Sequence, residues 1–501
     1  MTQHYLPQTM PPAASAYIAS MPPGRVELFS LTPLDKTGVA CWNVIFLPAD
    51  GRPFQGETPH GVGYGVTDTD AIIGATGELA EAVHSAAGFA AMPRVSGSFA
   101  ALSTTHGKRG VADPLTLCLP AGSPVDGDTA MQWVSARRWP SGETVLVPAE
   151  MAACAPGDLP AGYTPFTTPI TNGLGAGPTL DFAIGHGLGE LLQRDGNGLG
   201  FRAMDRGIVI DFDVEPADPR TRDLLALFSR QGIDVLPKFA ADEFGVANIY
   251  VVGCEPVAVP PFPMMVTACG EAASLDREQA LRKALLEFAS SRMRKSFSHA
   301  PLDAVSHVAP PGYVERFTAF HNLATEESRA LSAMKAWCGS DAASLRATLS
   351  ESVLSRRGRR SFSSLPTWPG QLSDTPVVTE IARRLAEAGM EVLFLDFSPP
   401  QSPDVHVVKV IVPGLEVETM SYHRIGERGV LKLLERNSPL VGLGRPPEGA
   451  RAIRLPAGAA ERLGGAAWLD VVAVDRLVGS LYPLYREPLV HSAPIALARA
   501  R

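Results

Sequence analysis

Three segments of this chain share a pattern that a packed core seldom accepts, a helix rich in Ala and Leu with a glutamate among its apolar residues. Glu78 and Glu81 follow Gly-Ala-Thr-Gly, Glu190 lies in Gly-Leu-Gly-Glu-Leu-Leu, and Glu287 lies in Lys-Ala-Leu-Leu-Glu-Phe. A buried carboxylate is costly unless it is paired or bound to a cation. Three such helices together are compatible with one metal-phosphate site.

The spacing within these helices places polar groups on common faces. Residues three or four apart share a helix face, so Glu78 and Glu81 point the same way, as do His186, Glu190 and Arg194. Magnesium takes oxygen ligands from carboxylates and from substrate phosphates. A single pair of this kind is usually a surface ion pair. With three apolar helices carrying the pattern, the ion-pair and the metal-site interpretations are equally open.

Arginines in the same helices suit the phosphate part of such a site. Arg194 and Arg292 carry guanidinium groups that can bind phosphate oxygens in a bidentate manner. The basic run from Arg356 to Arg360 is interpreted instead as a solvated loop, with an anion or peptide contact as the alternative. No Ser-His-Asp or Cys-His arrangement emerges from local spacing, so no catalytic nucleophile is assigned.

Composition limits the classes of function. The 501 residues carry a net charge of −8, which gives no reason to expect nucleic-acid binding. The six cysteines form no CxxC pair, as expected for reduced thiols in the cytosol. We find no signal-peptide pattern and no apolar stretch that spans a bilayer, so we expect a cytoplasmic protein without a membrane contact.

The chain divides by composition into a tail, a body and an extension. Residues 1–25 are predicted to be a flexible tail, 26–436 the main body with a helical and Ser/Arg-rich insertion at about 301–375, and 437–501 a C-terminal extension. Strands and helices mix in the body, which predicts an α+β fold. The strands are expected at 27–31, 39–47, 115–119, 144–148, 207–214, 249–252, 391–397 and 405–412, and the helices at 70–89, 180–194, 276–295, 314–335 and 375–388.

The usual nucleotide-binding signatures are absent from the sequence. Gly107-Lys108 is followed by Arg109 and lacks the preceding glycine of a P-loop. Gly173, Gly175 and Gly177 do not match the dinucleotide fingerprint. Read alone, these alternating glycines indicate a flexible turn before a helix, where backbone N–H groups can approach a phosphate.

At this point the chain resembles the YcaO family of ATP-dependent enzymes that activate peptide backbone amides. The resemblance extends from about Leu34 to Leu434, so it assigns the YcaO-type fold and a YcaO domain to residues 26–436. Its strongest stretch runs from Thr171-Asn172-Gly173-Leu174-Gly175 into Gly187-Leu188-Gly189-Glu190-Leu191-Leu192-Gln193-Arg194-Asp195. Further similar stretches are Leu34 to Val39, Gly142 to Glu150, Val410 to Glu416 and His423 to Arg428.

The resemblance implies a split ATP site made of three motifs. The family pattern SxxxExxER falls on Gly74, Glu78 and Glu81 with Ala82 in place of arginine, SxxxExxxR falls on His186, Glu190 and Arg194, and ExxQxR falls on Glu287, Ser290 and Arg292. It implies Glu78, Glu81, Glu190 and Glu287 as magnesium ligands. It also implies nucleotide contacts at Asn172, His186, Arg194, Ser290 and Arg292.

The resemblance further implies Mg-ATP-dependent modification of a ribosomally synthesised precursor peptide, giving an azoline or a thioamide. The chain ends Ser-Ala-Pro-Ile-Ala-Leu-Ala-Arg-Ala-Arg rather than in the PxPxP tail of many azoline-forming members, so both outcomes stay open. We expect a separate leader-binding, TfuA-like or ubiquitin-activation-like partner, and a homodimer is compatible with the sequence. The alternative is a catalytically impaired nucleotide-binding scaffold, because Ala82, His186 and Ser290 depart from the family motifs.

Overall fold

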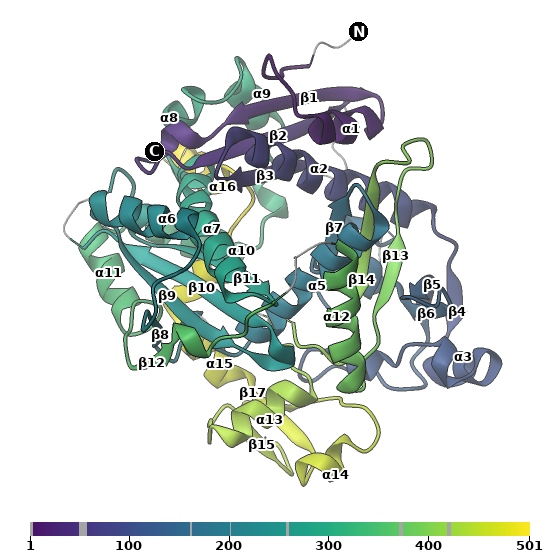
Figure 1. The fold of residues 1–501 in the computed structure, drawn as a ribbon. Helices are drawn as coiled ribbons and strands as arrows, with labels where there is room; N and C mark the ends of the chain where they lie inside the picture. Colours follow the sequence, from purple (N-terminus) through teal and green to yellow (C-terminus); the bar gives the residue numbers. More distant parts are fainter. Residues whose placement is uncertain are drawn as a thin grey trace. The chain divides into compact units, whose positions relative to one another are not determined.

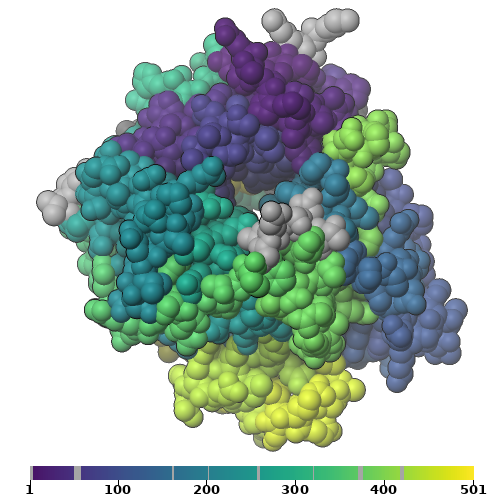
Figure 2. Space-filling model, in the orientation of Figure 1, coloured from purple at the N-terminus to yellow at the C-terminus, as the bar shows by residue number. Residues whose placement is uncertain are grey.

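The computed structural model describes residues 4–49, 58–160, 163–200, 202–256, 260–369, 374–417 and 422–500, which are coloured in Figure 2. The chain folds into two compact units. The first unit comprises residues 1–79, 200–368 and 479–501, and the second comprises residues 80–199 and 369–478. The chain therefore passes between the units several times, and the limits at 26 and 436 stay predictions.

The first unit contains two sheets. One is antiparallel with the order β1-β2-β3, and the other has the order β11-β10-β9-β8-β12, in which only β12 and β8 are parallel. The strands are β1 (Gly24–Ser30), β2 (Ala40–Pro48), β3 (His60–Gly65), β8 (Ile208–Asp211), β9 (Asp234–Ala241), β10 (Ala247–Cys254), β11 (Ala268–Ser274) and β12 (Gly358–Ser361).

Helix α7 (Arg277–His299) is the central helix of this unit and packs on β11 and β10 (Figure 1). Its buried side chains Leu281, Phe288 and Met293 belong to the main hydrophobic core. The Phe288 ring meets Phe228 edge to face at a centroid distance of 5.4 Å. The other helices are α1 (Pro12–Ser20), α6 (Pro219–Arg230), α8 (Leu302–Ser306), α9 (Tyr313–Phe320), α10 (Ser328–Cys338), α11 (Ala342–Ser350) and α16 (Ser492–Arg499), and α2 (Asp68–Ala91) begins here.

The second unit is built on a six-stranded sheet with the order β4-β5-β13-β14-β7, and β6 pairs with β5. These strands are β4 (Val95–Gly97), β5 (Met131–Arg138), β6 (Thr144–Pro148), β7 (Leu174–Gly177), β13 (Leu393–Asp396) and β14 (His406–Ile411). A small sheet, β15 (Val441–Leu443), β17 (Ala467–Asp470) and β16 (Ala450–Ala452), lies in the chain beyond residue 437. The helices are α3 (Phe99–His106), α4 (Ala149–Ala152), α5 (Leu180–Asn197), α12 (Asp374–Glu387), α13 (Glu427–Glu435), α14 (Ala459–Leu463) and α15 (Val471–Val478).

Two expectations for irregular segments are wrong. Within the segment before Val26, Pro12–Ser20 form helix α1, because Pro at the first position suits a helix start and Ala14 and Tyr17 are buried. Of the alternating glycines, Gly175 and Gly177 lie in strand β7, which pairs with β14, whereas Gly173 lies in the turn before this strand. Glycines within a strand let its backbone lie directly against a helix, and a local turn signal does not reveal that neighbour.

Other corrections concern the type or length of an element. No strand forms at 115–119. Pro114–Thr116 form a short 3-10 turn instead, and Asp113 in front of it accepts the Leu115 N–H at 2.9 Å. The expected helix at 314–335 is two helices, α9 and α10. The second half of the basic run forms edge strand β12, which begins at Gly358. The arginines are ion-paired: Arg356 with Asp234, Arg359 with Asp211 and Arg360 with Asp242. No helix in the described ranges is long and apolar enough to cross a membrane.

Candidate functional site

Each of the three glutamate helices follows a strand after a loop of two residues, so the chain contains the same strand-helix unit three times: β3-α2, β7-α5 and β11-α7. The residue before each helix accepts a hydrogen bond from a backbone N–H of the first turn, which fixes where the helix begins. Thr67 accepts from the Asp70 N–H at an N···O distance of 3.2 Å, and Thr179 accepts from the Phe182 N–H at 3.1 Å. Asp276 accepts from the Glu278 N–H at 2.8 Å.

Glycines in the strands bring each strand directly onto its helix. A Cβ atom at Gly63 would lie 1.9 Å from the Ala71 carbonyl oxygen in α2. The same atom at Gly175 would lie 2.1 Å from the Ala183 carbonyl in α5, and at Gly270 2.1 Å from the Ala284 carbonyl in α7. Only glycine fits at these positions, because any side chain would overlap the helix backbone.

The close approach lets a backbone N–H within the strand, or directly before it in the case of Gly173, bind the glutamate of the helix. Each donor lies 16 or 17 residues before the glutamate and meets its Oε2 atom. The three bonds are Val62 N–H to Glu78 at 2.9 Å, Gly173 N–H to Glu190 at 3.0 Å and Glu271 N–H to Glu287 at 3.1 Å. One oxygen of each carboxylate is therefore fixed by the main chain.

The second oxygen of these carboxylates is oriented by the same contact. Among the residues that the structure describes, Oε1 of Glu78 and Oε1 of Glu287 make no hydrogen bond or ion pair. Oε1 of Glu190 lies 3.6 Å from Nη2 of Arg194. A carboxylate held through one oxygen with the other oxygen available is suited to bind a hard cation.

Glu287 has the most enclosed environment of the predicted ligands in the first unit. Its Oε2 also accepts a hydrogen bond from the Tyr64 hydroxyl at 3.3 Å. Burial raises the pKa of the Glu287 carboxyl, the negative charge of Glu271 raises it further, and the positive charges of Arg294 and Lys283 oppose the shift. A bound cation would offset this destabilisation of the ionised carboxylate.

Ser290 is buried one turn after Glu287. Its hydroxyl lies 3.4 Å from the Cys41 sulfur, and its exposed fraction is 0%. The Cys41 thiol has a pKa raised to about 11, mainly by burial, so this sulfur is a neutral neighbour. Ser290 therefore packs against strand β2 in the core, one helical turn after Glu287.

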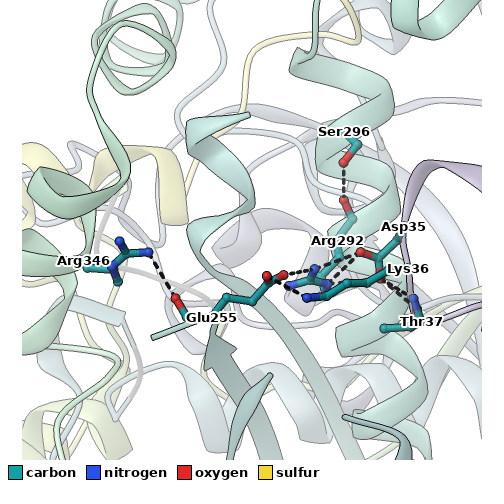
Figure 3. Close-up of polar contacts among 7 residues, drawn as sticks. All are labelled: Asp35, Lys36, Thr37, Glu255, Arg292, Ser296 and Arg346. Carbon is teal, nitrogen blue, oxygen red and sulfur yellow. Dashed lines mark hydrogen bonds and ion pairs between the residues drawn. The ribbon is translucent and has the colours of Figure 1, made fainter. Parts of the chain in front are cut away.

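Arg292 is held by two carboxylates (Figure 3). Its Nη2 atom lies 2.8 Å from Asp35 Oδ1 and 2.7 Å from Glu255 Oε1, and its Nε atom donates to Asp35 at 3.1 Å. Lys36 binds the second oxygen of Glu255 at 2.7 Å. Nη1 of Arg292 is buried and has no hydrogen-bond partner among the described residues, so this one atom keeps its capacity to bind an anion.

The second unit positions the remaining predicted residues. Asn172 directly precedes the glycine that binds Glu190, and its buried Nδ2 atom has no hydrogen-bond partner in the described part of the chain. His186 is exposed on α5, one turn before Glu190, and Arg194 is half-buried one turn after it. Glu81 is half-buried on α2.

The predicted site residues are thus divided between the two units. Glu78, Glu287, Ser290 and Arg292 belong to the first unit, and Glu81, Asn172, His186, Glu190 and Arg194 belong to the second. Within the described ranges, no three His, Cys, Asp or Glu side chains converge closely enough to hold a metal ion. The role of each residue in binding stays a prediction.

Sequence reasoning missed several residues around the predicted ligands. Tyr64 and Glu271 contact Glu287 from two different strands, and such long-range contacts leave no local pattern. Asp35 and Glu255 surround Arg292 from positions far apart in the chain. Arg294 was identifiable, because it lies seven residues after Glu287 and therefore on the same helix face.

The fold and the repeated unit define an α+β protein that presents several main-chain-oriented carboxylates. The chain belongs to the YcaO family: the family model, described as a YcaO cyclodehydratase that binds ATP and Mg²⁺, matches residues 62–416. The expected family, the fold class and the cofactors ATP and Mg²⁺ are confirmed by this match. The chain is thus a member of an ATP-dependent enzyme family.

Known proteins support the same assignment of the fold. An uncharacterized protein of Methanothermobacter thermautotrophicus is 29% identical over 321 residues, which cover 63% of this chain and 73% of that protein. A heterocyclase in complex with substrate and cofactor has a TM-score of 0.57 at 18% identity, covering 83% of this chain and 53% of that one. YcaO from Methanopyrus kandleri, bound with AMPPCP and Mg²⁺, has a TM-score of 0.52 at 20% identity, covering 80% and 88%. This chain spans about half the length of the heterocyclase.

Proposed function

We propose that this protein uses Mg-ATP to activate a backbone amide of a ribosomally synthesised peptide. The observation that carries the proposal is the repeated bond from a backbone N–H, within a strand or directly before it, to the Oε2 atom of Glu78, Glu190 and Glu287. These bonds orient one oxygen of each carboxylate, including that of Glu78, which is exposed. Together with Glu81, the three glutamates are the proposed magnesium ligands.

The polar groups around these glutamates fit a magnesium-bound nucleotide. Nη1 of Arg292 and Nδ2 of Asn172 are buried donors without a protein partner among the described residues. Buried donors normally find an acceptor, and phosphate or nucleotide oxygens would provide one. Arg194 and the exposed His186 complete the proposed nucleotide contacts, and buried Ser290 is assigned a supporting position.

The proposed reaction needs positioning and charge stabilisation. A nucleophile adds to the amide carbon, the resulting oxyanion attacks the γ-phosphate of ATP to release ADP, and phosphate then leaves with the original amide oxygen. Mg²⁺, when bound, would neutralise charge on the phosphates. This chain's glutamates would orient the cation, and Arg292 would hold a phosphate oxygen through Nη1.

The incoming nucleophile decides the product. A Cys, Ser or Thr side chain of the peptide gives an azoline, and an external sulfide source gives a thioamide. A separate leader-binding, TfuA-like or ubiquitin-activation-like protein is the proposed partner that brings the peptide. The alternative proposal is a nucleotide-binding scaffold without turnover, in view of Ala82, His186 and Ser290.

The test incubates the full chain with ATP, Mg²⁺, candidate precursor peptides and candidate partner proteins encoded beside its gene. Mass spectrometry reads the peptide and a colorimetric assay reads phosphate. Loss of 18 Da, the mass of water, from the peptide, matched by phosphate release, supports azoline formation; exchange of oxygen for sulfur supports a thioamide. ATP binding without turnover supports the scaffold, and no ATP binding at all contradicts the proposal.

A further inference from the structure

We propose that Arg294, two residues beyond the arginine of the family motif, binds the phosphate chain of the nucleotide beside Glu287 and Glu78. The inference rests on the proposed function and adds a residue to its site. It follows from the face of α7 that carries Arg294, from the exposure of this residue and from the charges around it.

The helix geometry separates the two arginines. Successive residues of an α-helix are rotated by about 100°, so a residue seven positions on returns to within about 20° of the starting direction, and one five positions on lies about 140° away. Arg294 therefore projects from the Glu287 face of α7. Arg292 projects from a different face, toward Asp35 and Glu255, as its ion pairs require.

Arg294 is an exposed residue without a direct partner among the residues that the structure describes. Its side chain is exposed, and among the described residues it makes no hydrogen bond or ion pair within 4.0 Å. Other arginines of α7 are occupied: Arg282 pairs with Asp218, and Arg277 donates to the Ser363 carbonyl. Five N–H donors of Arg294 are thus available for an external acceptor.

The charges around Arg294 match a cation and a phosphate better than a simple ion pair. Carboxylates of Glu287, Glu78 and Glu487 all act on this guanidinium without forming a contact to it. Desolvation by the surrounding protein would by itself lower the pKa of Arg294, and these negative charges outweigh that effect and raise it. An arginine that stays protonated and makes no contact to a described carboxylate can bind phosphate oxygens in a bidentate manner while Glu287 and Glu78 bind the metal.

The experiment measures the affinities of the full-length protein for Mg-ATP and for magnesium tripolyphosphate, which probes the phosphate chain alone. We expect Arg294→Gln to weaken both by about 10- to 100-fold, as for loss of a charge-assisted hydrogen-bonded pair. Arg294→Lys should recover part of the loss. The matched control Arg282→Gln, on the same helix but paired with Asp218, should keep the wild-type affinities.

The outcomes separate this inference from the proposed function. If the wild type binds Mg-ATP and Arg294→Gln binds both probes as tightly as the wild type, Arg294 is only a counter-charge of the glutamates and the inference is wrong. An equal loss in Arg282→Gln contradicts it as well. Absence of Mg-ATP binding by the wild type overturns the proposed function, and the inference falls with it.

Discussion

The backbone N–H of Val62 donates to Oε2 of Glu78 at 2.9 Å, and the two residues lie on a strand and on the helix that follows it. The bond fixes a carboxylate without neutralising it, because a peptide N–H carries only a partial charge. Two further strand-helix units reproduce this contact at Glu190 and Glu287. The same backbone contact therefore orients all three glutamates that the sequence singles out.

The first prediction concerns the strand-helix contact itself. Gly270→Ala should lower the free energy of unfolding by about 2 kcal/mol or more, because its Cβ would lie 2.1 Å from the Ala284 carbonyl oxygen and 2.2 Å from the Phe288 nitrogen. Gly189→Ala is the control, since no atom lies within 4 Å of its added Cβ in helix α5. The control should be neutral or stabilising by about 0.5–1 kcal/mol. Equal stabilities of the two variants in denaturant titrations would contradict the close approach.

The second prediction concerns the carboxylates around Arg292. Asp35→Ala leaves a buried guanidinium with one of its two carboxylate partners and should cost about 3–5 kcal/mol of stability. Lys36→Ala removes a half-exposed partner of Glu255 from the same network and should cost about 1 kcal/mol or less. Thermal or chemical denaturation of the two variants measures the difference. Similar small losses in both would show that Asp35 does not hold Arg292.

The third prediction concerns the pH dependence of stability. His491 is buried beside Phe297 and Phe317, and its Nε2 atom lies 3.1 Å from the Tyr313 hydroxyl. Burial is the largest cause that lowers the pKa of His491, to about 3. In the unfolded chain the pKa of this histidine has its ordinary value of about 6.5, so the unfolded chain takes up the proton first as the pH falls. The neutral, buried His491 therefore contributes to the stability of the fold above pH 6.5, and this contribution is lost as the pH falls toward 3.

Removal of this histidine should flatten the acid side of the stability profile. His491→Asn keeps a residue that tolerates the left-handed backbone at this position, where φ is 66°. Urea titrations between pH 7.5 and 4.5 should show the wild type losing up to about 1.4 kcal/mol per pH unit more than the variant. Parallel profiles would mean that His491 is accessible to protons in the folded protein.

The sequence predicts the helices of the site well and their partners poorly. The helices around Glu190 and Glu287 have clear caps in Thr179 and Asp276, so their beginnings follow from local chemistry. The strand before Glu190 was missed, because alternating glycines indicate a turn when their neighbours are unknown. Strand β7 is stabilised by helix α5 and strand β14, against which it packs, and these neighbours are not visible in the local sequence.

The same limit applies to the arginines. The motif spacing that selects Arg292 is local, whereas the carboxylates that hold its guanidinium come from Asp35 and Glu255, far apart in the sequence. The sequence predicts which face of the helix carries Arg294. It does not predict that Arg294 has no partner among the described residues. Motif spacing therefore selects candidate residues, and the folded environment decides which atoms remain available.

The central claim is that the main-chain-oriented glutamates bind the magnesium that accompanies ATP. The most direct measurement is the affinity of the full-length protein for ATP as a function of Mg²⁺ concentration, by calorimetry, for the wild type, Glu287→Gln and the surface control Glu387→Gln. We predict that Mg²⁺ strengthens ATP binding in the wild type and the control, and that Glu287→Gln loses most of this gain. An unchanged gain in Glu287→Gln would contradict the claim.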